Sequence, residues 1–236
     1  MDTPVKKVAV ITGASQGIGA GLVEAYRGLG HAVVATSRGI TPAADPDVLT
    51  VQGDIADPAT AERVVAAAIE RFGRIDTLVN NAGRYLAKPF TEYSREEYET
   101  VVGVNLTGFF HITQLAVRQM LRQGTGHLVQ ISTSLADHAD STTPALLASL
   151  TKGGLQSATR ALAIEYASRG IRSNAVALGV IRTPVHPEAS PGLAALHPLG
   201  RMGEVGDVVD AIVFLEKAPF VTGEILHVDG GRSAGR

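Results

Sequence analysis

The stretch VAVITGASQGIGAGLVEAYRGLG, residues 8–30, determines the fold predicted for this chain. It begins with a short apolar, β-branched run, passes through Gly13, Gly17 and Gly19, and continues as a helix-like segment. Glycine permits a tight turn and a close approach of the backbone to a ligand. A strand, a glycine-rich turn and a helix in this order are typical of a pyrophosphate site, where backbone N–H groups and the positive end of the helix meet the anion.

The same alternation continues along the chain. Apolar runs predict strands at residues 8–11, 31–36, 48–52, 77–80, 127–132, 173–177 and 225–228, and helices are predicted at 18–29, 59–72, 95–122, 144–168 and 205–216. Continuous apolar strands separated by helices predict an α/β protein with a doubly wound, Rossmann-type parallel sheet of about seven strands and helices on both faces. We expect one domain over residues 1–236, with a proline-rich substrate loop near 184–200 at the carboxyl edge of the sheet.

Composition narrows the function classes. The 236 residues are 45% hydrophobic and 19% charged, with a net charge of −2 and no cysteine. Disulfides, a thiol nucleophile and a thiolate zinc site are therefore excluded, and no metal site is predicted. No basic stretch is long enough for a nucleic-acid partner, and the apolar run at 8–11 is too short for a signal peptide or a membrane span. We expect a cytoplasmic protein that acts on a small molecule, without a nucleic-acid or membrane partner.

The second predicted strand ends in VVATSRG, which places Ser37 and Arg38 at its carboxyl end. An acidic residue usually stands there when the cofactor has a free ribose 2′-hydroxyl. A guanidinium beside a hydroxyl suits a 2′-phosphate instead. The sequence therefore favours NADP(H) over NAD(H).

Six motifs occur in an order that resembles the short-chain dehydrogenase/reductase family: TGASQGIG (12–19), GDI (53–55), NNAG (80–83), VNLTGFF (104–110), IRSNAVALGVIRTP (171–184) and VTGEILHVDGG (221–231). The resemblance covers nearly the full length. It implies a Rossmann-type oxidoreductase, assembled as a homotetramer or homodimer. The residues expected at the cofactor are Gly13, Ser15, Gln16, Gly17, Ile18, Gly19, Ser37, Arg38, Asp54, Ile55, Asn81, Ala82, Gly83, Lys152, Gly179, Val180, Ile181 and Thr183.

The resemblance also implies an active site of asparagine, serine, tyrosine and lysine. Asn105 and Lys152 match that pattern, but Ala148 stands four residues before the lysine, where the family has its tyrosine. Aligned from the fifth strand, Thr133 takes the serine position and Ser134 follows it. Aligned by spacing back from Ala148, Leu135 takes that position. We favour the strand alignment because loops absorb changes of length.

The family tyrosine donates a proton, and loss of a positioned general acid costs about 10²–10⁴ in rate. Three alternatives remain open. Lys152 could act through a water held at Asn105. Tyr85 or His138 could enter the substrate pocket as the acid. Finally, an iminium ion or an activated alkene would need no such acid, and Ala148 would then widen the pocket for a bulkier substrate.

Two functions follow from these residues. The first is an NADP(H)-dependent oxidoreductase that transfers hydride to or from a small carbonyl, imine or enone substrate at a non-standard site. The second is a catalytically silent NADP(H)-binding sensor or structural subunit. The retained Lys152 and the GVIRTP segment (179–184), which the resemblance places at the nicotinamide, favour the enzyme.

Overall fold

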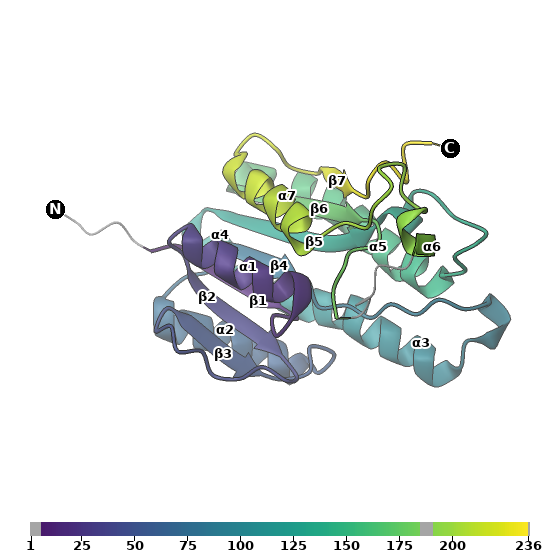
Figure 1. The fold of residues 1–236 in the computed structure, drawn as a ribbon. Coiled ribbons are helices and arrows are strands. Elements are labelled where there is room, and N and C mark those ends of the chain that lie inside the picture. The colour runs from purple at the N-terminus through teal and green to yellow at the C-terminus, as the bar shows by residue number, and fades with distance from the viewer. Residues whose placement is uncertain (1–5, 185–190, 236) are drawn as a thin grey trace.

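The computed structural model describes residues 6–184 and 191–235. Its centre is a seven-stranded sheet in the order β3-β2-β1-β4-β5-β6-β7 (Figure 1), and every strand pair is parallel. The strands are β1 Val8–Thr12, β2 Ala32–Ser37, β3 Val48–Gln52, β4 Thr77–Asn80, β5 Gly126–Thr133, β6 Ile171–Leu178 and β7 Ile225–Val228. All seven predicted strands are present. The doubly wound Rossmann-type prediction is confirmed.

Helices cover both faces of the sheet. They are α1 Gly17–Gly28, α2 Pro58–Phe72, α3 Arg95–Val102, α4 Phe109–Gln123, α5 Leu146–Tyr166, α6 Pro191–Ala194 and α7 Val205–Lys217, with short 3₁₀ turns at Phe90–Glu92, Ser134–Ala136 and Ala167–Arg169. Apolar side chains of α1 and α7 pack on one face of the sheet, and those of α2, α4 and α5 pack on the other. The five central strands, β2, β1, β4, β5 and β6, are buried between the two layers, which explains their continuous apolar sequence, whereas the edge strands β3 and β7 are only partly buried.

The predicted helix 95–122 is present but not uniform. A π-helical turn, Gly103–Gly108, lies between α3 and α4 and contains Asn105. Single π turns inside α-helices are frequent at functional sites because they redirect a side chain. The stretch Arg95–Gln123 is the one helix among the described residues that is long and apolar enough to cross a membrane. Its residues Ile112, Ala116 and Met120 are fully buried against the sheet, so this apolarity serves the protein core.

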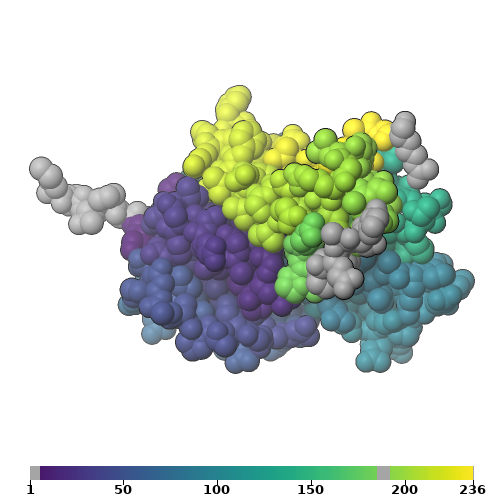
Figure 2. Space-filling model, in the orientation of Figure 1, coloured from purple at the N-terminus to yellow at the C-terminus, as the bar shows by residue number. Residues whose placement is uncertain are grey.

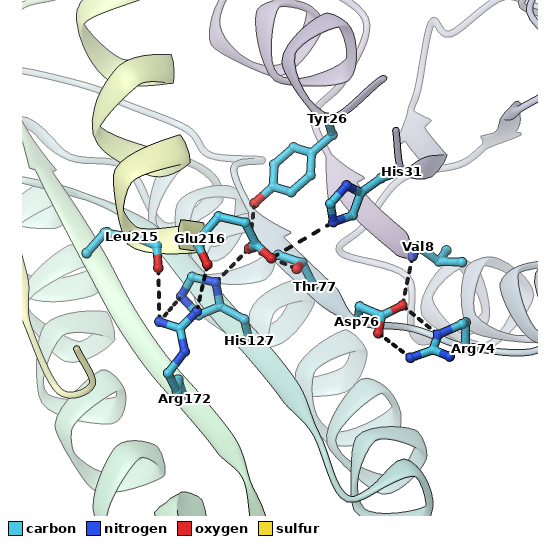
Figure 3. Close-up of polar contacts among 10 residues, drawn as sticks. All are labelled: Val8, Tyr26, His31, Arg74, Asp76, Thr77, His127, Arg172, Leu215 and Glu216. Atoms are coloured by element: carbon cyan, nitrogen blue, oxygen red, sulfur yellow. Dashed lines mark hydrogen bonds and ion pairs between the residues drawn. The ribbon is translucent and has the colours of Figure 1, made fainter. Parts of the chain in front are cut away.

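A buried polar cluster lies at the amino ends of the central strands (Figure 3). The Glu216 carboxylate, at the end of α7, accepts hydrogen bonds from Thr77 Oγ1 (3.0 Å) and Tyr26 OH (3.2 Å) and lies 2.8 Å from His127 Nδ1. Asn174 Nδ2 donates to the other ring nitrogen of His127 (3.1 Å), so Nδ1 carries the proton and donates to Glu216. The cluster ties α1 and α7 to three strands.

The opposite edge, formed by the carboxyl ends of the strands, is where this fold binds ligands. Strands β2 and β3 lie on one side of β1, and β4 lies on its other side. The loops that follow β1 and β4 therefore run in opposite directions, and a crevice opens between them. Of the predicted substrate loop, residues 185–190 lie outside the described residues. Residues 191–194 form α6.

Candidate active site

A cavity of about 1090 Å³ opens at the carboxyl edge of the sheet. Its wall contains every residue that the sequence placed at the cofactor: Gly13, Ser15, Gln16, Gly17, Ile18, Gly19, Ser37, Arg38, Asp54, Ile55, Asn81, Ala82, Gly83, Lys152, Gly179, Val180, Ile181 and Thr183. The volume is large enough for a dinucleotide and a small substrate together, since ordinary ligand sites occupy about 300–1,000 Å³. The described residues contain no cluster of three or more metal-ligating side chains.

The glycine-rich turn is shaped by contacts that a side chain would block. Gly13 has a φ of 66°, and a Cβ built on Gly19 would lie 2.2 Å from the Gly13 carbonyl oxygen. Asn81 Nδ2 donates to the carbonyls of Thr12 (2.9 Å) and Gly13 (3.1 Å), which fixes the turn against the β4 loop. Gln16, the residue before α1, makes no side-chain cap in the described structure. The first N–H groups of α1 therefore lack a side-chain acceptor, which suits a phosphate.

Ser37 and Arg38 lie at the end of β2, on the cavity wall. The Ser37 hydroxyl is buried and has no hydrogen-bond partner among residues 6–184 and 191–235, and the same is true of Thr36. Gln52 Nε2 donates to the Arg38 carbonyl at 2.7 Å and so holds the backbone of this segment. The buried Ser37 hydroxyl and the neighbouring Arg38 guanidinium together fit a ligand with acceptor oxygens, such as a phosphate.

Lys152 projects from α5 into the cavity wall, and its Nζ donates to the Ile131 carbonyl at 2.7 Å. Gly83 packs directly against it, because a Cβ built there would lie 3.0 Å from Nζ and 3.6 Å from Asn105 Oδ1. Burial disfavours the charged form and lowers the pKa of Lys152 to about 8. The side chain can therefore gain and lose a proton near neutral pH.

Asn105 lies behind the cavity wall rather than in it. Its Oδ1 accepts from the Arg84 backbone N–H (2.8 Å), and its Nδ2 donates to the Arg84 carbonyl (3.0 Å) and to Thr151 Oγ1 (3.0 Å). The side chain is almost completely buried. Asn105 therefore connects the loop after β4 with the turn of α5 that carries Lys152, and it fixes the position of both.

The two candidate hydroxyls at the end of β5 have different surroundings. Thr133 lines the cavity, donates to the Leu178 carbonyl at a long 3.4 Å and accepts from Leu135 N. Ser134 is buried outside the described lining, and its hydroxyl donates to the same carbonyl at 3.2 Å. Ser132 also lines the cavity, which the sequence did not predict, and donates to the Lys152 carbonyl at 3.1 Å.

The wall next to Lys152 is apolar. Ala148 lines the cavity and packs with Leu135 and Ala145 in a small buried cluster. Tyr85 lines the cavity from the β4 loop, and burial raises its pKa despite the opposing charge of Arg232. His138 is exposed and does not belong to the described lining.

Comparisons with known proteins agree with this geometry. A family model described as enoyl-(acyl carrier protein) reductase matches residues 13–233. The chain is 35% identical over 246 residues to the granaticin polyketide synthase putative ketoacyl reductase 2 of Streptomyces violaceoruber, covering 98% of this chain and 97% of that protein.

The chain belongs to the short-chain dehydrogenase/reductase family.

Solved structures extend the likeness to three dimensions. The 3-ketoacyl-(acyl-carrier-protein) reductase from Brucella melitensis, complexed with NADH, has a TM-score of 0.89 at 30% identity, covering 96% of this chain and 98% of that one. ElxO with NADP bound has a TM-score of 0.90 at 27% identity, covering 98% and 100%. Our chain is thus an oxidoreductase of the short-chain dehydrogenase/reductase family.

Two further residues of this short-chain dehydrogenase/reductase were not predicted from the sequence. Arg232, after β7, lines the cavity. His197, within the predicted substrate loop near 184–200, is 3% exposed and accepts a hydrogen bond from the Val180 N–H at 2.9 Å. It is buried because the chain after α6 packs against the Gly179–Ile181 segment, where a Cβ built on Gly179 would lie 2.7 Å from His197 Nε2. No local sequence signal reports this packing.

Proposed function

We propose that this protein is an NADP(H)-dependent oxidoreductase that transfers hydride to or from a small carbonyl, imine or enone substrate, with Ala148 at the position where the family has its tyrosine. The observation that carries the proposal is the Lys152 ammonium in the cavity wall, one helical turn after Ala148. NADPH, when bound, supplies the hydride. The chain has to bind and orient both ligands and to deliver a proton.

The phosphate-binding turn and the end of β2 support NADP(H). The turn offers the glycine cradle and the uncapped amino end of α1, and Ser37 and Arg38 offer a hydroxyl and a guanidinium for a 2′-phosphate. Solved neighbours have NADH or NADP bound, so the neighbours alone do not choose between the two cofactors. The preference rests on this chain's own residues.

Lys152 is the proton source that the contacts favour. Lys152 lines the cavity, its pKa of about 8 suits an acid at neutral pH, and a water beside the small Ala148 side chain would connect it with the substrate. His138 is exposed and away from the described lining, and burial makes Tyr85 a weaker acid. Asn105 contributes by holding the Arg84 backbone and Thr151, and Thr133 is the hydroxyl available to orient the substrate.

The exposed apolar side chains of α5 support the assembly of copies of this chain through that helix. Leu146, Leu150 and Ile164 recur on one face, and they are 44%, 55% and 84% exposed. Exposed apolar side chains of this kind, spaced along one helix face, suit a partner helix. We infer a homodimer or homotetramer in which α5 packs against its own copy.

The proposal is tested by NADPH consumption with ketones, quinones, cyclic imines and enones, and with NADH in parallel. Lys152→Met is the matched variant because methionine keeps the length of the side chain but cannot carry a proton. Turnover with NADPH that is lost in Lys152→Met supports the proposal, and the substrate class that reacts chooses among the three routes to the missing acid. NADPH binding without oxidation by any class contradicts it.

A further inference from the structure

Arg232 lines the cavity where the segment after β7 meets the loop between β5 and α5. It follows β7 on the turn Asp229–Gly231, in which Gly230 and Gly231 have φ values of 61° and 88°. The Asp229 carboxylate accepts from the backbone N–H groups of Gly231 (3.0 Å) and Ser233 (2.8 Å), which fixes this turn. The turn directs the C-terminal residues, yellow in Figure 2, toward the teal segment that precedes α5.

The Arg232 side chain is only 9% exposed, and burial of a charge is costly unless the charge is paired. Its Nη2 donates to Asp140 Oδ2 (2.9 Å) and to Thr143 Oγ1 (3.2 Å), both in the loop between β5 and α5. Hydrogen bonds from the Thr142 hydroxyl and N–H, together with Arg232, lower the pKa of Asp140 to about 2. Arg232 is therefore held by a carboxylate that stays ionised.

A guanidinium presents five N–H donors in a planar fork. Both hydrogen bonds of Arg232 come from Nη2, and in the described part of the chain Nε and Nη1 have no hydrogen-bond acceptor. The Nη2 end of the guanidinium therefore holds Arg232 in place. Because Arg232 lines the cavity, its Nε and Nη1 donors are left for a ligand there. A preorganised arginine of this kind is suited to bidentate recognition of a carboxylate.

The charge of the cavity points the same way. Among the described lining residues, Arg38, Arg84, Lys152 and Arg232 are basic, and Asp54 alone is acidic. Arg38 and Asp54 lie after β2 and β3, on the adenosine side. The substrate end is thus lined by three basic residues and no acidic one. The Asp140 carboxylate beside Arg232 offsets one of these charges, and the two that remain give a field that favours an anion.

We propose that Arg232 binds the carboxylate of the substrate, so that the enzyme reduces a carbonyl, imine or enone compound that is also a carboxylic acid. Leu135, Leu193 and Leu196 also line the cavity, and they suit a substrate with an apolar segment between its reducible group and its carboxylate. This inference deepens the proposed function and rests on it.

The test compares matched acids and methyl esters with NADPH: acetoacetate and methyl acetoacetate, 4-oxopentanoate and its methyl ester, and 2-oxo-4-phenylbutanoate and its methyl ester. A charge-assisted hydrogen bond contributes enough to predict a kcat/KM about 10- to 100-fold higher for the acid of a pair. In Arg232→Met the acid loses that factor, mainly through KM, and the ester is unchanged. Arg169→Met is the matched control, because Arg169 is an exposed arginine outside the described cavity lining, and this variant keeps the acid preference.

Equal kcat/KM for acid and ester in the wild type, or an equal loss for both in Arg232→Met, overturns the inference and leaves the proposed function intact. Oxidation of NADPH by neither member of any pair counts against the proposed function instead. In that case, binding of the three acids to the enzyme–NADP⁺ complex is measured by calorimetry. Loss of binding in Arg232→Met supports the role of Arg232. The inference is overturned if no acid binds the wild type or if the variant binds the acids equally well. Arg232→Lys keeps a charge beside Asp140, and an unchanged NADPH affinity in both variants shows that they are folded.

Discussion

Lys152 gives the proposed reaction a pH dependence that can be worked out in advance. Burial of the Lys152 ammonium lowers its pKa to about 8, and reduction needs the protonated form. With that pKa, about nine-tenths of the lysine is protonated at pH 7 and about one-tenth at pH 9. The rate of reduction therefore falls about tenfold between pH 7 and pH 9, and about a further tenfold by pH 10.

The assay is kcat/KM for NADPH oxidation, measured from pH 6 to pH 10 with the most active substrate of the panel. Lys152→Arg is the matched variant, because arginine stays protonated over the whole range. Its rate is lower, since the guanidinium has a different shape and a poorly matched pKa, but its profile is flat to pH 10. In the oxidative direction the wild-type dependence is reversed, because the unprotonated lysine accepts the proton.

A wild-type profile that stays flat to pH 10 would refute this assignment. So would the same decline in Lys152→Arg, because the titrating group would then lie elsewhere. A decline that begins only above pH 9 would transfer the role to a phenol whose pKa burial has raised, for which Tyr85→Phe is the direct check.

The structure predicts four further outcomes. Arg38→Ala raises the calorimetric Kd of NADPH about 10- to 100-fold and leaves that of NADH within about twofold, because only NADPH loses a charge-assisted contact; equal losses for both would exclude 2′-phosphate recognition. His197→Met removes the acceptor for the Val180 N–H and weakens NADPH but not 2′,5′-ADP, whereas His197→Gln retains affinity; parallel losses for the two ligands would mean a purely structural role. Glu216→Gln lowers the free energy of unfolding in urea by about 3 kcal/mol at pH 7. The pKa of Glu216 is about 2 in the fold in place of 4.5, so the ionised carboxylate stabilises the fold above pH 4.5, and this stability is lost as the pH falls toward 2. An unchanged wild-type stability between pH 4.5 and pH 2 would contradict this prediction. Leu150→Glu halves the mass of the oligomer in size-exclusion chromatography with light scattering, from dimer to monomer or from tetramer to dimer, and an unchanged mass would place the interface on another surface.

The sequence predicted the fold well because the decisive signals are local. The five central strands are buried on both faces and therefore appear as continuous apolar runs, the edge strands β3 and β7 are only partly buried, and helix-like segments separate most of these runs. The glycine spacing at residues 13–19 reflects backbone contacts made within one turn, so the part of the cavity wall that this turn forms was also predicted from local pattern. The ends of the elements shifted, as at α5, which begins at Leu146 instead of residue 144. The π-helical turn within the predicted helix 95–122 and the short helix α6 were not predicted.

The substrate end was predicted less well, because it is assembled from distant parts of the chain. Arg232 and Asp140 are 92 residues apart in sequence, and their contact depends on how the C-terminal segment folds back over the loop before α5. The hydrogen bond between the Val180 N–H and His197 forms because the segment after α6 packs against the chain that follows β6. The cluster around Glu216 joins residues from α1, β4, β5 and α7 in the same way.

The central claim, hydride transfer at a site with Ala148 in place of a tyrosine, is tested most directly by following the hydride. The enzyme is incubated with NADPH that carries deuterium on the transferable C4 position and with the most active substrate, and the product is analysed by mass spectrometry. We predict one deuterium on the reduced carbon in the wild type, and a rate that collapses in Lys152→Met. NADPH that binds tightly yet yields no deuterated product with any substrate class would contradict the account and favour a silent cofactor-binding protein.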